Sequence, residues 1–207
     1  MSLKSSDDPS KYISVQQTLV EPIVNAIRVP DFKVECPIKS SRIWSALTAH
    51  PEDFSHKRDV LIGGDALTFC MTVALQGCFP RSAKLINIFR KALLSKEVLA
   101  ELLYKMDPTG SRRHDIAAAH DILKAAIGHV FNKQGPDAIL CWMFRTFKDL
   151  IVEAMHTMRE CLKDGSLRLW LDLEEVKALH GGVCPPERES EKSVEKDLEE
   201  DIGLPYD

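Results

Sequence analysis

The sequence predicts an all-α fold, and three observations lead to this prediction. Apolar residues recur at intervals of three and four through most of the chain, which is the spacing of one helical face. No pair of stretches shows the alternation and turn signals of paired strands. Glycine and proline divide the helical patterns into segments of ordinary length. At 207 residues and 44% apolar content, the chain can bury the core of one domain.

The expected helices follow one another with short connections. Pro22 should kink the first helix or start a new one, because proline lacks the N–H that continues a helix. Ser95 and Pro136 occupy positions that favour a helix start. We expect helices over residues 14–27, 41–49, 57–77, 85–94, 95–105, 115–131, 136–162 and 174–179, with residues 167–170 as a short strand or a helical turn.

The charge distribution divides the chain into a domain and two tails. Residues 1–11 are polar and are expected to be a flexible tail. Residues 181–207 hold nine acidic and three basic side chains and few apolar ones, so we expect an acidic, disordered tail. The helical domain is therefore assigned to residues 12–180. Without the acidic tail the charge is +2, which is too weak to identify a nucleic-acid-binding protein by itself.

The composition also restricts the compartment. No run of 18 apolar residues is present, and the first thirty residues lack the basic pattern of a signal or transit peptide. The six cysteines form no CxxC pair, which favours reduced packing residues over disulfides or zinc. We expect an intracellular protein without membrane contact, in the cytoplasm or nucleus. The mitochondrion is the third candidate compartment, although the missing presequence argues against it.

One stretch carries an unusual combination of residues. Asp65 follows Gly63 and Gly64 within a long apolar helix. An ionised carboxylate is costly to bury unless a partner or a metal compensates it. Each glycine costs about 1 kcal/mol relative to alanine in a helix interior. The combination indicates a site rather than an ordinary core helix.

Four segments resemble the endonuclease domain of the ribonuclease III family. Ser45-Ala-Leu-Thr-Ala-His50 is similar to the family's Ala-Leu-Thr-His, with one residue inserted. Residues 58–67 resemble its signature helix around Gly-Asp-Ala, and residues 89–100 and 120–135 resemble the two patterned segments that follow. The four occur in the family's order across residues 41–150. The resemblance implies a ribonuclease III endonuclease-domain-like helical fold.

The resemblance also implies a metal site. The family places two carboxylates on each of two helices, where they hold Mg²⁺ for phosphodiester hydrolysis. The matching positions here are Leu61 and Asp65, then Asp121 and Lys124. Two carboxylates remain, so we expect Mg²⁺ binding to be weak or lost. Lys124 is expected to pair with Asp121 or Asp65, which would turn the nuclease site into a buried or half-buried ion pair.

Two alternatives remain open for these residues. In the structural alternative, Asp65 braces a backbone, Asp121 and Lys124 form a surface pair, and Leu61 belongs to the core. In the catalytic alternative, Asp65 and Asp121 still hold one Mg²⁺ with a third carboxylate, Glu153 or Asp59. That site would give slow cleavage of double-stranded RNA.

Partners follow from the resemblance as well. Arg112, Arg113 and Lys84 are candidate contacts for double-stranded or structured RNA. The family dimerises through its signature helix, where Ile62 replaces a bulky aromatic residue, so we expect a homodimer or a heterodimer with another ribonuclease III-like domain. Degenerate members of the family are structural proteins of mitochondrial ribosomes.

We therefore expect a catalytically impaired protein of RNA binding, RNA processing or ribonucleoprotein assembly. The two other functions are an active Mg²⁺-dependent endoribonuclease and a protein-interaction module without RNA function.

Overall fold

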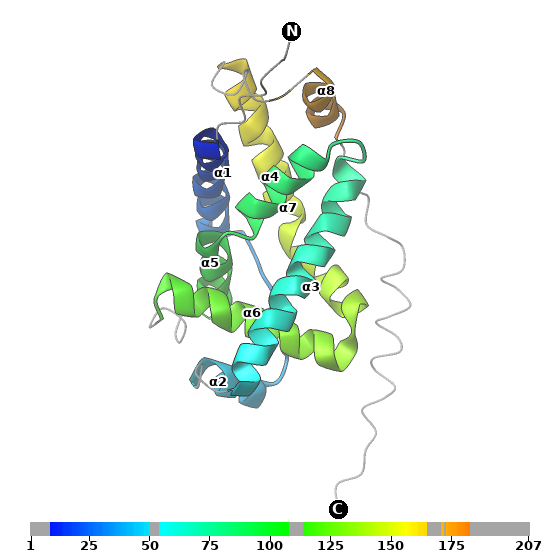
Figure 1. The fold of residues 1–207 in the computed structure, drawn as a ribbon. Helices are drawn as coiled ribbons and strands as arrows, with labels where there is room; N and C mark the ends of the chain where they lie inside the picture. Colours follow the sequence, from blue (N-terminus) through cyan, green and yellow to red (C-terminus); the bar gives the residue numbers. More distant parts are fainter. Residues whose placement is uncertain (1–8, 50–53, 108–113, 165–170, 172, 183–207) are drawn as a thin grey trace, which may run out of the picture.

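The computed structural model describes residues 9–49, 54–107, 114–164, 171 and 173–182, and all regular structure in these ranges is helical (Figure 1). The all-α prediction is therefore confirmed for this part of the chain. The helices are α1 (Pro9–Arg28), α2 (Ser41–Ala49), α3 (Phe54–Cys78), α4 (Ala83–Leu93), α5 (Lys96–Met106), α6 (Ile116–Gln134), α7 (Pro136–Lys163) and α8 (Leu173–Gly181).

The expected helices are all present, with two differences near the N-terminus. Pro22 lies inside α1, which is a single helix, so no new helix starts there. The same helix begins at Pro9, inside the segment expected to be a tail, because proline is favoured in a first helical turn. Residues 1–8, 167–170 and 183–207 lie outside the described residues, and with them the expected tails and the strand or turn.

Helix α3 supplies much of the core. It packs mainly against α6 and also contacts α4 and α7, and Leu67, Met71 and Leu75 are buried. By length and composition alone, His56–Cys78 could cross a membrane, with a mean hydropathy of 1.4. Core helices of soluble proteins pass the same test, so this finding is weak evidence for a membrane span.

Helices α3 and α6 cross in backbone contact at two glycines (Figure 1). A Cβ atom at Gly63 would lie 1.9 Å from the carbonyl oxygen of Lys124, and one at Gly128 would lie 2.0 Å from that of Asp59. Both distances are far inside van der Waals contact, so neither position accepts a side chain. Gly63 is therefore needed for helix packing, which accounts for its cost in helix propensity.

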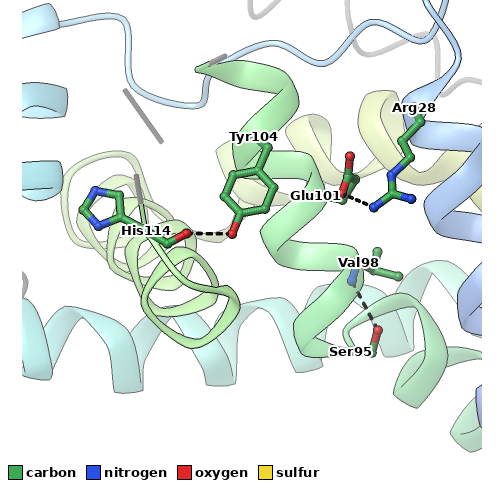
Figure 2. A network of polar contacts seen from close by, with 6 residues as sticks. All are labelled: Arg28, Ser95, Val98, Glu101, Tyr104 and His114. Atoms are coloured by element: carbon green, nitrogen blue, oxygen red, sulfur yellow. Dashed lines mark hydrogen bonds and ion pairs between the residues drawn. The ribbon is translucent and has the colours of Figure 1, made fainter. Parts of the chain in front are cut away.

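Figure 2 shows three of the polar contacts made at helix α5. The Ser95 hydroxyl caps its first turn by accepting from the Val98 N–H at 3.3 Å, as the sequence predicts. Arg28 of α1 donates to Glu101 at 3.1 Å. The Tyr104 hydroxyl donates to the carbonyl oxygen of His114 at 2.9 Å, which fixes the chain just before α6.

The crossing predicts that alanine at Gly63 or Gly128 lowers the free energy of unfolding, whereas alanine at the adjacent Gly64 raises it. Gly63→Ala and Gly128→Ala should each lower the free energy of unfolding by roughly 1–3 kcal/mol, because overpacking must push the two helices apart. Gly64→Ala is the matched control, since its Cβ would meet only the Lys124 side chain at 3.6 Å. That variant should gain up to about 1 kcal/mol from helix propensity.

Urea denaturation of the three variants measures these differences. Equal stability of Gly63→Ala and the parent protein would show that the helices do not touch at this point.

Candidate functional site

The two candidate positions on α3 face solvent. Leu61 is 72% exposed, and Asp65, one turn later, is also exposed. The expectation that Asp65 bears a burial cost is wrong, because the buried face of α3 is the one that carries Gly63 and Leu67. The structural alternative that places Leu61 in the core is wrong for the same reason. The Asp65 side chain is thus hydrated and has no burial cost for an internal partner to offset.

Lys124 does not form the expected ion pair. Within the described residues, no carboxylate oxygen of Asp65 or Asp121 lies within 4.0 Å of its ammonium group. Its side chain instead lies against Gly64, with Nζ 3.6 Å from the place of a Cβ atom there. The aliphatic chain of Lys124 thus reaches α3 one residue before Asp65. The expected ion pair of Lys124 with Asp65 or Asp121 is therefore wrong, as is the surface pair of Asp121 with Lys124 in the structural alternative.

Asp121 pairs with its neighbour His120 instead. The Asp121 carboxylate lies 2.8 Å from Nδ1 of His120, and its side chain is 51% exposed, whereas His120 is buried. Burial lowers the pKa of His120 below its ordinary value of 6.5, and the positive charge of Lys124 lowers it further, against the opposing effect of Asp121. The neutral ring therefore donates its Nδ1–H to the carboxylate.

The proposed third carboxylates differ in their positions. Asp59 is buried, and its Oδ1 accepts from Asn132 Nδ2 at 3.1 Å. It lies six residues before Asp65, about 120° around α3, and so points away from that side chain. Glu153 is half-buried on α7. Among the described residues, no group of three histidine, cysteine, aspartate or glutamate side chains is arranged to hold a metal ion.

Of the three expected RNA contacts, the structure describes Lys84 alone. Lys84 forms an ion pair with Glu175 of α8 at 3.1 Å, and only 31% of its side chain is exposed. Arg112 and Arg113 lie outside the described residues. Lys84 is therefore largely engaged in fastening α8 to α4.

The predicted dimer position lies beside an exposed apolar stripe. Ile62 is half-buried, but Leu61 and Phe69 are 72% and 57% exposed. Leu61, Asp65 and Phe69 recur every four residues and so share one face of α3. The sequence prediction missed Phe69, although its spacing of four from Asp65 was a usable signal.

Comparisons of the chain with protein-family models, with curated proteins and with solved structures found no match. The function proposed below is therefore supported by the residues of this chain and by the contacts that they make.

The buried histidine predicts a pH dependence of stability. Above pH 7, His120 is neutral in both folded and unfolded states. As the pH falls below 6.5, the unfolded chain binds a proton that the folded protein accepts only at lower pH, so the free energy of unfolding decreases. His120→Gln should remove this part of the decrease.

Denaturation of both proteins between pH 7.5 and 5 measures the difference, and the imidazole NMR shifts report the pKa directly. Parallel pH profiles, or titration of His120 at or above 6.5, would contradict the assignment.

Proposed function

We propose that this chain is a ribonuclease III-like helical protein that binds double-stranded or structured RNA and has lost efficient phosphodiester hydrolysis. One observation carries the proposal beyond the sequence resemblance. Helices α3 and α6, which carry all four family metal positions, are each other's main packing partners. Their contact at Gly63 and Gly128 brings Lys124 against α3 beside Asp65. A site built from both helices requires this proximity.

The loss of hydrolysis follows from the chemistry of two side chains. Leu61 offers no oxygen to a metal, and the ammonium group of Lys124 repels a divalent cation. Mg²⁺ bound by Asp65 and Asp121 alone would keep most of its water ligands and bind weakly. Asp121 is also shared with His120, which competes for one carboxylate oxygen.

The exposed apolar residues of α3 suggest that binding of a protein partner is part of this function. Leu61 and Phe69 are exposed apolar side chains on either side of Asp65, on the face of α3 opposite its buried residues. Such a surface suits a second ribonuclease III-like domain, either another copy or a different chain, within an RNA-processing or ribosomal assembly. The same stripe favours the second candidate, a protein-interaction module without RNA function. An intracellular site, in the cytoplasm, nucleus or mitochondrion, fits both functions.

Incubation of the purified protein with long double-stranded RNA separates the candidate functions. The expected result is a gel shift at low salt without cleavage in Mg²⁺ or Mn²⁺. Cleavage that disappears in Asp65→Ala and Asp121→Ala would contradict the loss of catalysis. Failure to bind at about 50 mM salt, where phosphate contacts are strong, would favour the interaction module.

Restoring the acidic positions should restore metal affinity. The double variant Leu61→Glu and Lys124→Glu places four carboxylates at the family positions and should raise Mg²⁺ affinity roughly tenfold or more. Val152→Glu with Lys91→Glu changes the net charge equally on α7 and α4 and serves as the control. Isothermal titration calorimetry measures both. Equal affinity of the two variants would mean that the four positions do not converge.

A further inference from the structure

A second site lies at the same helix crossing, on the side away from Asp65. A pocket of about 460 Å³ opens between α2, the first two turns of α3 and the last turns of α6. Figure 1 shows α2 beside the beginning of α3. The pocket uses α3 before Gly63 and α6 after Gly128, whereas Asp65 and Lys124 lie beyond these glycines. We call it the basic pocket.

Basic side chains surround the basic pocket. Arg42 of α2, Arg58 of α3 and Lys133 of α6 line it and are exposed, and His56 and His129 add two imidazole rings. Arg42 and Lys133 form no ion pair within the described part of the chain. Among the described residues, no carboxylate competes with an external anion for these two side chains.

The single carboxylate among the described lining residues does not cancel this charge. Asp59 is only 10% exposed at its side chain, and its Oδ1 accepts from Asn132 and lies 3.5 Å from Arg58. These contacts turn the carboxylate inward and join α3 to α6. The described lining residues include three basic groups and one carboxylate, so the opening of the pocket has a net positive charge.

The helices that carry the basic groups are positioned by contacts of their own. Trp44 Nε1 of α2 donates to Asp107 Oδ2 at 3.2 Å, which anchors α2 beside the pocket. His56 and Arg58 belong to the first two turns of α3, where the helix dipole favours an anion. The carboxyl end of α6 has the opposite sign, and Lys133 in its last turn offsets that effect.

From this arrangement we propose that the basic pocket binds a backbone phosphate of RNA. Arginine and lysine side chains around an open cavity are the usual ligands of a phosphodiester, and they bind it without regard to base sequence. The pocket is larger than one phosphate group and opens to solvent, so the neighbouring nucleotides can remain outside. This inference rests on the proposed RNA-binding function. It assigns phosphate contacts to Arg42 and Lys133 in place of Lys84, which is paired with Glu175.

Charge-neutralising variants of the full chain test the pocket. Arg42→Gln with Lys133→Gln should weaken binding to a double-stranded RNA of about 20 base pairs roughly tenfold. It should also reduce the slope of log affinity against log salt by about two, one for each lost phosphate contact. Lys33→Gln with Lys91→Gln removes the same charge outside the pocket and should change neither quantity as much.

The outcomes separate the pocket from the proposed function. If the parent protein binds RNA and both double variants bind equally well, the pocket inference is wrong and the function stands. If the parent binds no RNA at low salt, both are wrong. A third measurement adds inorganic pyrophosphate to the parent and to the pocket variant. If it raises the melting temperature of the parent but not of the pocket variant, while RNA affinity is unchanged, the ligand is a small phosphate compound rather than RNA.

Discussion

The backbone contact between α3 and α6 is the constraint on which the rest of the structure depends. Two helices approach this closely only where neither carries a side chain at the point of contact, and Gly63 and Gly128 meet that requirement from segments 65 residues apart. The contact fixes which face of α3 is buried. With Gly63 turned inward, Leu67 points to the core, and Asp65 must face solvent.

The same contact also determines where the Lys124 side chain lies. Lys124 lies at the crossing itself: its carbonyl oxygen packs against Gly63, and its side chain extends over Gly64. The ammonium group is thereby held beside α3, and within the described residues it forms no ion pair with Asp65 or Asp121. Gly63 lies outside the Gly64-Asp65-Ala66 core of the resemblance to ribonuclease III. The close approach in this chain thus depends partly on a residue that the resemblance did not supply.

Sequence reasoning predicted the helices well but not the faces that they expose. Caps and breakers are local, so Ser95 and Pro136 marked helix starts correctly. The exposure of Asp65 depends on how α3 is rotated about its axis, and an apolar pattern on both faces leaves that rotation undetermined. The basic pocket was missed because Arg42, Arg58 and Lys133 come from three helices, and only the packing of α2 against α6 brings them together.

The two sides of the crossing differ in the charge that they favour. In the family pattern, four carboxylates attract metal ions, and the metals in turn attract phosphate. Here Leu61 and Lys124 remove most of that negative charge, so a phosphate backbone would approach this side without metal ions to neutralise repulsion from Asp65 and Asp121. The proposed phosphate contact in the basic pocket needs no such intermediary, because Arg42 and Lys133 line the pocket and would meet an anion directly. Under the proposed function, binding without cleavage is the outcome that these residues favour: affinity for RNA would come from side chains that cannot activate water, and not from bound metal ions.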